Sequence, residues 1–156
     1  MKKRKIYIVL GILLLILIDQ ISKLIISKYL VNSNFILIPK FLMFTYIKNF
    51  GAAFGILEGK RIFFIIITVI VSSYLIYELI RSKEKFNTLS LVLIISGILG
   101  NFIDRVVFGY VRDFISFSIF NPVFNLADSF IVIGVIIYVI NMFVGDKNES
   151  KKWRCW

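Results

Sequence analysis

Four apolar runs, each long enough to cross a membrane, constrain this chain more than any other feature. They cover about residues 6–26, 62–80, 87–108 and 125–144, and a helix of about 20 apolar residues spans the hydrocarbon core of a bilayer. Hydrophobic residues make up 59% of the 156 residues, whereas a soluble domain averages about 45–50%. The sequence therefore predicts an all-α membrane protein with four transmembrane helices and a minor β component.

The whole chain is expected to form a single membrane domain. Outer segments are expected at residues 27–61 and 109–124, and a loose, basic tail at residues 145–156. Partial alternation of apolar and polar residues in 41–49 and in 115–119 predicts short strands in the two outer segments.

Basic residues at the ends of the spans predict the orientation. The basic runs at 2–5, 81–85 and 147–154 all fall on one side of a four-span topology, and Lys and Arg are enriched on the cytoplasmic side. We therefore expect both termini in the cytoplasm, although Lys28, Lys40, Lys48, Lys60 and Arg61 fall on the other side. The net charge of +10 is interpreted as orientation beside anionic lipids, and no nucleic-acid partner is expected.

Composition also limits the possible chemistry. The chain has no histidine and a single cysteine, Cys155, which excludes Ser-His and Cys-His catalysis and an intrachain disulfide. We expect no metal and no cofactor. A Ser22–Lys23 dyad is disfavoured, because adjacent residues on a helix do not face each other.

Polar and charged residues gather near one level of the predicted membrane. An ionisable residue at membrane depth is costly and by default marks a functional site. At about 1.5 Å per residue, Asp19 lies roughly 20 Å along the first helix, in the outer half of a core about 30 Å thick. Further polar residues lie at the outer ends of the later spans or beside them: Asn49, Asn101, Asp104, Arg105, Asp113, Asn125 and Asp128.

Asp113 and Asp128 flank a connection of about 14 residues between antiparallel helices, so we expect them to be neighbours. Two close carboxylates repel as anions, so one keeps a proton while the other is ionised. Such a pair can act on one water as general base and general acid. Taken singly, Asp113 could instead be a solvated loop residue, and Asp128 a helix cap or a partner of the helix dipole.

The other charged residues have structural interpretations. Asp19 and Lys23 lie at i and i+4 of one helix and are interpreted first as an ion pair that makes both tolerable in lipid. Asp104 and Arg105 are interpreted likewise as a structural clamp. Small residues at 97 and 100 are expected to allow close helix contact.

Five short motifs follow one another along nearly the whole chain. They are Asp19-Gln20-x-x-Lys23, Asn49-x-Gly51-Ala52-Ala53-Phe54-Gly55, Gly97-x-x-Gly100-Asn101-x-x-Asp104-Arg105, Val111-x-Asp113-Phe114 and Phe124-Asn125-x-Ala127-Asp128-Ser129. In this order they resemble the signal peptidase II family, the lipoprotein signal peptidases, which are intramembrane aspartyl proteases of bacteria. Each motif alone is weak, but five in order are specific.

The resemblance implies roles for the polar residues. The catalytic pair would be Asp113 and Asp128. The residues that shape the site and hold substrate would be Asn49, Gly51, Asn101, Arg105 and Asn125. Structural support would come from Asp19, Lys23 and Asp104.

The resemblance also implies an activity and a fold. The substrate would be a prolipoprotein whose cysteine carries diacylglyceryl, cut before that cysteine at the outer face of the bacterial cytoplasmic membrane. Globomycin-type cyclic peptides would inhibit the enzyme. A small extracytoplasmic β-cradle would be built from residues 31–48 and 115–119. Two rival functions are a small transporter or proton-conducting protein, which the clustering of acids at one face disfavours, and a non-enzymatic assembly subunit.

Two residues depart from the family's pattern. Lys48 stands where arginine is usual, which keeps the charge but loses the bidentate fork. Arg112 stands where an apolar residue usually precedes the aspartate. We hypothesise that this cation favours the ionised form of Asp113 and biases it toward the role of base.

Overall fold

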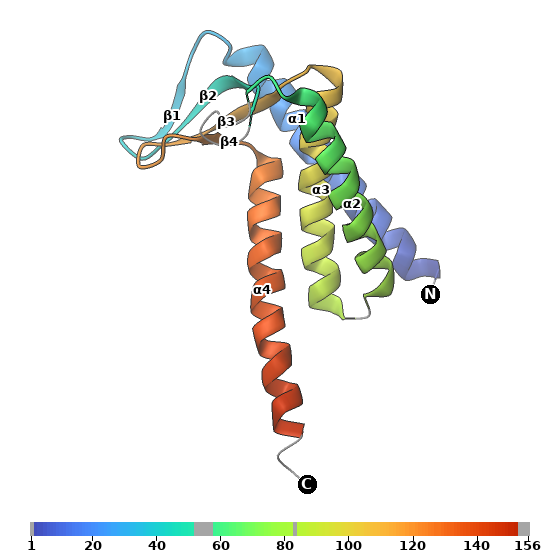
Figure 1. The fold of residues 1–156 in the computed structure, drawn as a ribbon. Coiled ribbons are helices and arrows are strands. Elements are labelled where there is room, and N and C mark those ends of the chain that lie inside the picture. The colour runs from blue at the N-terminus through green and yellow to red at the C-terminus, as the bar shows by residue number, and fades with distance from the viewer. Residues whose placement is uncertain (1, 52–57, 83, 153–156) are drawn as a thin grey trace.

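The computed structural model describes residues 2–51, 58–82 and 84–152. This part of the chain forms four long helices, α1 (Lys2–Tyr29), α2 (Arg61–Arg81), α3 (Lys85–Val107) and α4 (Leu126–Lys152). A small sheet covers one end of the helices (Figure 1). Its strands are β1 (Phe35–Ile38), β2 (Leu42–Asn49), β3 (Val111–Phe117) and β4 (Val123–Phe124). The predicted class, mostly helical with a minor β component, is confirmed.

All four helices are long and apolar enough to cross a membrane. The qualifying stretches are Lys3–Tyr29, Arg61–Arg81, Phe86–Val107 and Leu126–Phe143, within about three residues of the predicted spans. Half of the apolar stretch of α3 is buried, against 11% in each of the other three. α3 is therefore the centre of the bundle, and the outward faces of the other helices are apolar surfaces of the kind that lipid covers.

Contact between α3 and its neighbours depends on glycines. A Cβ on Gly97 would lie 2.2 Å from the backbone oxygen of Ala127, at the start of α4. A Cβ on Gly100 would lie 2.7 Å from the Asp19 Oδ2 atom of α1. Neither position has room for a side chain, so the predicted role of these small residues in close helix contact is confirmed.

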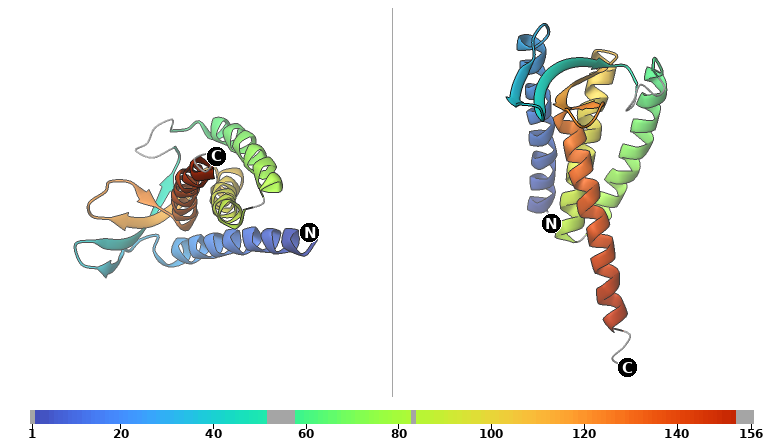
Figure 2. Two further views of the ribbon diagram at one scale, coloured as in Figure 1. Left: turned by 90° about the horizontal axis from the view of Figure 1, so that it is seen from below. Right: turned by 90° about the vertical axis from the view of Figure 1, so that its left-hand side faces the viewer.

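The tail predicted to be loose at residues 145–156 is helical over most of its length. α4 continues to Lys152 and extends past the ends of the other helices (Figure 2). Extending an existing helix adds one hydrogen bond per residue without a new nucleation cost, and Lys and Glu are good helix formers. Residues 153–156, with Cys155, lie outside the described residues.

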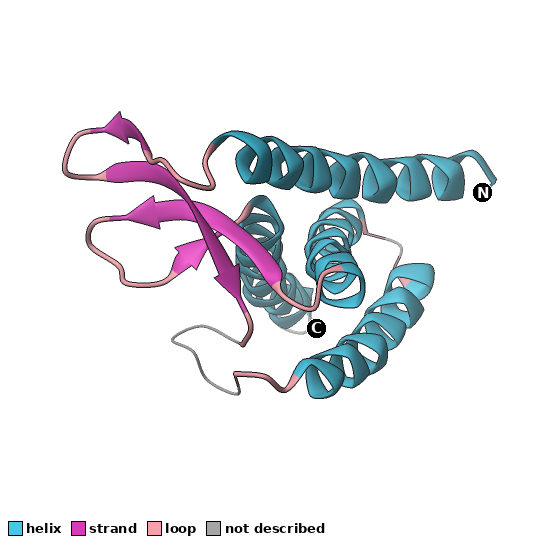
Figure 3. Cartoon of the chain, turned by 90° about the horizontal axis from the view of Figure 1, so that it is seen from above, coloured by secondary structure: helices cyan, strands magenta, loops and turns pink. Residues whose placement is uncertain are grey.

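The strands form an antiparallel sheet in the order β1-β2-β3-β4 (Figure 3). The strand predicted in 41–49 is confirmed as β2. The strand predicted at 115–119 is longer and earlier than expected, since β3 begins at Val111. Asp113 therefore lies inside a strand and is only 2% exposed, so its interpretation as a solvated loop residue is wrong. β4 has two residues, too few for an alternating pattern to reveal.

Candidate active site

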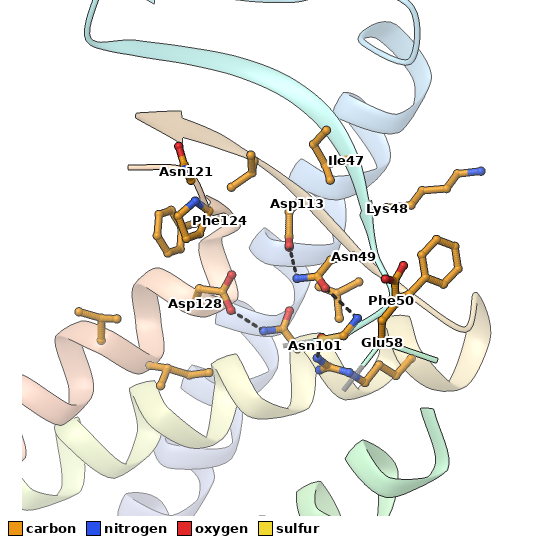
Figure 4. Close-up of a pocket in the computed structure, with 17 residues that line it drawn as sticks. Ile47, Lys48, Asn49, Phe50, Glu58, Asn101, Asp113, Asn121, Phe124 and Asp128 are labelled. Atoms are coloured by element: carbon orange, nitrogen blue, oxygen red, sulfur yellow. Dashed lines mark hydrogen bonds between the residues drawn. The ribbon is translucent and has the colours of Figure 1, made fainter. Parts of the chain in front are cut away.

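A cavity of about 600 Å³ lies between the sheet and the N-terminal end of α4. Asp113 from β3 and Asp128 from the first turn of α4 both line it, so two segments 15 positions apart in sequence bring their carboxylates to one cavity (Figure 4). Apolar side chains of β4 and α4 complete the wall, among them Phe124, Ile131 and Val132. The cavity can therefore hold an apolar ligand next to two acids.

The pleat of the sheet directs Asp113 into this cavity. Asn49 is the last residue of β2 and pairs with Val111, which makes it a diagonal neighbour of Asp113 on the same face of the sheet. Its Nδ2 donates to Asp113 Oδ2 at 2.8 Å, and its Oδ1 accepts from the backbone N–H of Gly51 at 2.9 Å. The end of β2 thus orients one oxygen of the carboxylate. The remainder of this motif, residues 52–55, lies outside the described residues.

Asp128 is held by the N-terminus of α4. Asn125 precedes the helix, and its Oδ1 accepts from the backbone N–H of Asp128 at 2.9 Å, while Asp128 Oδ2 accepts from the backbone N–H of Asn125 at 3.1 Å. This reciprocal pair is a capping box. The interpretation of Asp128 as a helix cap is therefore confirmed. Capping uses only Oδ2, and the other oxygen, Oδ1, accepts from Asn101 Nδ2 at 2.8 Å, so Asp128 can cap the helix and line the cavity at the same time.

Asn125 also joins the two carboxylates. Its Nδ2 donates to Asp113 Oδ1 at 2.6 Å and to Asn101 Oδ1 at 3.1 Å. Asn125 therefore donates to both carboxylates, from its side-chain amide to Asp113 and from its backbone N–H to Asp128. Among the described residues no Lys or Arg nitrogen lies within 4.0 Å of either.

The surroundings of Asp113 favour its protonated form. Burial raises the pKa of Asp113 to about 7, and repulsion by the nearby Asp128 acts in the same direction. Hydrogen bonds from Asn49 and Asn125 oppose this rise because they stabilise the carboxylate. Near neutral pH the pair can therefore hold one proton between two acids.

A second cluster of charged side chains, two acidic and two basic, lies behind the cavity, between α1, α3 and β3. Lys23 Nζ lies 2.9 Å from Asp19 Oδ2 and 3.7 Å from Asp104 Oδ2, which confirms the predicted ion pair within α1. Arg112 donates to both oxygens of Asp104, from Nη2 at 2.7 Å and from Nε at 3.0 Å. These four side chains are 0–3% exposed, so two anions and two cations are buried together.

Asp104 and Arg105 do not form the predicted clamp. Successive helix residues point about 100° apart, so Asp104 faces Lys23 and Arg112 whereas Arg105 faces the cavity. Arg105 Nη2 donates to the backbone oxygen of Gly51 at 3.2 Å, and its guanidinium lies 4.7 Å from the centre of the Phe64 ring.

The hypothesis that Arg112 acts directly on Asp113 finds no support in the geometry. Neighbouring strand residues point to opposite faces of a sheet. Asp113 faces the cavity, whereas the Arg112 guanidinium is bonded to Asp104 and to Gln20 Oε1, the latter at 2.9 Å. Arg112 instead ties β3 to α1 and α3.

Gln20 has a role that the sequence did not reveal. Its Nε2 lies 3.1 Å from each of three oxygens, those of Asp19 Oδ2, Asp104 Oδ1 and the backbone of Gly100. The available signal was a neutral polar residue inside an apolar span beside Asp19. Among the described residues no buried side-chain N or O lacks a partner, so the cluster is fully hydrogen-bonded.

Comparisons with known proteins agree with the sequence motifs. The model of the family described as signal peptidase (SPase) II matches residues 11–144. The lipoprotein signal peptidase of Caldanaerobacter subterraneus subsp. tengcongensis is 48% identical over 124 residues, which covers 78% of this chain and 86% of that protein. That of Halothermothrix orenii is 45% identical over 144 residues, covering 91% and 97%.

The fold leads to the same group of proteins. A solved structure of a bacterial membrane enzyme matches with a TM-score of 0.84 and 40% identity, covering 91% of this chain and 90% of that one. This likeness and the four helices able to span a membrane indicate that the chain is a multi-pass membrane protein. The chain belongs to the signal peptidase II family, and is accordingly a protease.

Proposed function

We propose that this chain is an aspartic endopeptidase that removes signal peptides from diacylglyceryl-modified prolipoproteins, with Asp113 and Asp128 as its catalytic pair. The observation that carries the proposal is the environment of these two acids. Both line one cavity, where Asp113 is buried and Asp128 is partly buried. Both are held by asparagine amides, and neither has a cation within 4.0 Å among the described residues.

The chemistry follows from one proton shared by two acids. The ionised carboxylate takes a proton from a water molecule, which attacks the scissile carbonyl carbon. The protonated carboxyl polarises the carbonyl oxygen and then supplies a proton to the leaving amine, so that the pair ends the cycle with one proton. The raised pKa of Asp113, about 7, suits such sharing near neutral pH. We assign no separate roles, because coupled acids titrate as a pair.

The cavity wall suits a lipidated substrate. Ile131 and Val132 continue the cavity along α4, where an apolar signal helix and its diacylglyceryl chains would remain in a hydrocarbon environment. Asn49, Gly51 and Arg105 form the opposite polar side and would hold the substrate backbone. The cut would fall before the lipidated cysteine. Globomycin-type cyclic peptides would compete for the same cavity.

We infer the orientation from charge. The basic residues 2–5 at the start of α1 and Arg81 at the end of α2 lie at the end of the bundle away from the sheet, and Lys and Arg prefer the cytoplasmic side. The sheet and the cavity would then lie at the extracytoplasmic face of the bacterial cell membrane as a β-cradle. Cysteine accessibility in intact cells, with single cysteines introduced at positions 40 and 83 of a Cys155→Ser chain, tests this topology.

The deciding experiment incubates the purified chain with a diacylglyceryl-modified preprotein and with the same preprotein left unlipidated. We expect cleavage before the cysteine of the lipidated form only, and block by a globomycin-type peptide. Cleavage of both forms would contradict the lipid requirement. Proton or ion flux in liposomes without any cleavage would favour the transporter alternative, which the position of the acids at one end of the bundle does not support.

A further inference from the structure

A second cavity, of about 700 Å³, lies at the other end of the bundle. Its walls come from the first half of α1, the last turns of α2 and the middle of α3. α1 and α2 both lie beside α3 (Figure 2) but make few contacts with each other. The groove lies between them, over α3. Among the described residues none lines both cavities, so this groove is separate from the candidate active site.

The walls of the groove are aliphatic. Leu79 and Ile95 form its floor and are 8% and 1% exposed, whereas Val9, Leu13 and Ile80 form its rims and are more than half exposed. The volume is within the range of about 300–1,000 Å³ that is usual for ligand pockets. A hydrocarbon chain matches this lining, because it brings no polar atom that would need a partner.

The mouth of the groove is positively charged. Arg4 and Lys5 of α1 lie there together with Arg81 of α2, and no Asp or Glu is among the described residues that line the groove. Arg4 Nη2 donates to the backbone oxygen of Ser82 at 3.2 Å and to Thr88 Oγ1 at 2.7 Å. These bonds hold its guanidinium beside the connection between α2 and α3, where the apolar walls end.

We propose that this groove binds an anionic glycerophospholipid, with the phosphate at Arg4, Lys5 and Arg81 and one acyl chain along the aliphatic walls. Charge complementarity selects this occupant. Basic pockets between transmembrane helices at a membrane surface attract anionic headgroups, and guanidinium groups bind phosphate through two parallel hydrogen bonds. An apolar helix of another protein would cover the walls but would leave three cations unmatched.

The lipid would have a structural consequence. It would contact α1 and α2 at the same time and so connect two helices that otherwise meet mainly through α3. A ligand that binds only the folded protein stabilises it, and the stabilisation grows with the logarithm of the ratio of ligand concentration to Kd. The groove would therefore make the thermal stability of the bundle depend on anionic lipid. This inference concerns lipid binding and stands apart from the proposed proteolysis.

The test is native mass spectrometry of the full chain with phosphatidylglycerol or phosphatidylcholine of identical acyl chains. We expect phosphatidylglycerol to be retained preferentially. The double variant Lys5→Gln/Arg81→Gln should lose roughly 25-fold in phosphatidylglycerol affinity, because each surface cation is worth about fivefold, and should retain phosphatidylcholine as before. The matched control Lys28→Gln/Lys40→Gln, which removes two cations at the sheet end, should behave like the unaltered chain.

A second variant tests the groove without changing charge. Val9→Trp places a large side chain at an exposed rim position and should reduce retention of both lipids while the melting temperature in detergent stays the same. Equal retention of the two lipids by the unaltered chain would overturn the proposal. An equal loss of phosphatidylglycerol affinity in the control Lys28→Gln/Lys40→Gln would also overturn it. So would lipid retention in Val9→Trp and in Lys5→Gln/Arg81→Gln equal to that of the unaltered chain.

Discussion

Two pairs of aspartates lie within one end of this bundle, and they differ in what surrounds them. Asp19 and Asp104 face two cations, Lys23 and Arg112, and all of them are buried. Asp113 is buried as well and Asp128 is partly buried, but their partners are neutral asparagine amides. The four acids share a residue type and lie at the same end of the bundle, and the main difference between the pairs is the charge of their partners.

The comparison teaches how one fold can give some acids cationic partners and leave others with neutral ones. A buried carboxylate with a matched cation is held ionised, and removing either partner leaves an uncompensated charge. A buried carboxylate with amide partners and a second acid nearby retains a proton into the neutral range. The first pair is suited to holding helices and strands together, and the second to moving a proton.

Asn101 connects the two pairs. Its Oδ1 accepts from Lys23 Nζ at 2.9 Å and from Asn125 Nδ2 at 3.1 Å, and its Nδ2 donates to Asp128 at 2.8 Å. The cation of the structural cluster thereby fixes which way the amide points, and the amide then presents a donor to the titratable acid. The structural cluster thus helps to orient the candidate catalytic pair.

The largest expected effect is on the titratable pair. Asp113→Asn and Asp128→Asn should each nearly abolish cleavage of a lipidated preprotein, a loss of about 10²–10⁴-fold, because this is what general acid–base catalysis contributes from each group. The melting temperature should fall only modestly, because asparagine keeps the shape and removes a charge but turns one acceptor oxygen into a donor that faces another N–H group. Glu78→Gln on α2 is the matched control and should cleave normally. Full cleavage by either variant would show that Asp113 and Asp128 are not the catalytic pair.

The structural pair should respond in the opposite way. Asp19→Asn or Asp104→Asn leaves the buried cations in excess and should cost about 3–5 kcal/mol of folding free energy, measured as the denaturation midpoint and the yield of folded protein. Cleavage per folded molecule should fall far less than in the Asp113 and Asp128 variants. An Asp104→Asn protein as stable as the unaltered chain would show that the cluster is not structural.

Arg112 tests whether the structural cluster acts on the titratable pair through charge. Arg112→Val should destabilise the fold by about 2–3 kcal/mol, because it removes the bidentate partner of Asp104. Arg112→Lys should recover only part of this, because lysine lacks the planar fork. The pH dependence of cleavage should be the same in all three proteins. A shifted pH–rate profile in Arg112→Val would restore the hypothesis that this cation acts on Asp113.

The smallest expected effect is on pH dependence. The pKa of Asp113 is about 7, so the shared proton should be lost, and the rate should fall, as pH rises through about 7. Because this pKa is above that of an unfolded Asp, the folded state binds more protons and the contribution of Asp113 to stability decreases between about pH 4 and 7. Asn49→Ala removes a bond that lowers the pKa and should move the alkaline decline to higher pH. A decline at unchanged pH in Asn49→Ala would contradict this account.

Much of this organisation was predictable from local sequence. Helical spans are long and apolar, so their number and approximate ends follow from hydropathy alone. Asp19 and Lys23 are one turn apart in one helix, so their pairing depends on a single helical period. Motif order then indicated the family and the two acids that belong together.

Other features depended on contacts that no local pattern encodes. Arg112 and Arg105 each adjoin an aspartate in sequence, yet neither is paired with it. The pleat of β3 turns Arg112 away from Asp113, and the turn of α3 separates Arg105 from Asp104. The strand that contains Asp113 was also missed at its start, because the mostly buried residues of β3 do not alternate in polarity.

The sequence by itself determined the class of protein, the number of spans and which residues could carry charge at depth, because these properties depend on composition and helical spacing. Only the tertiary structure decided which acids are neutralised by cations and which remain able to share a proton. That decision depends on side chains from α1, α3, β2, β3 and α4 meeting in three dimensions, and the pKa of a carboxylate responds to the groups within a few ångströms in space, wherever they lie in sequence.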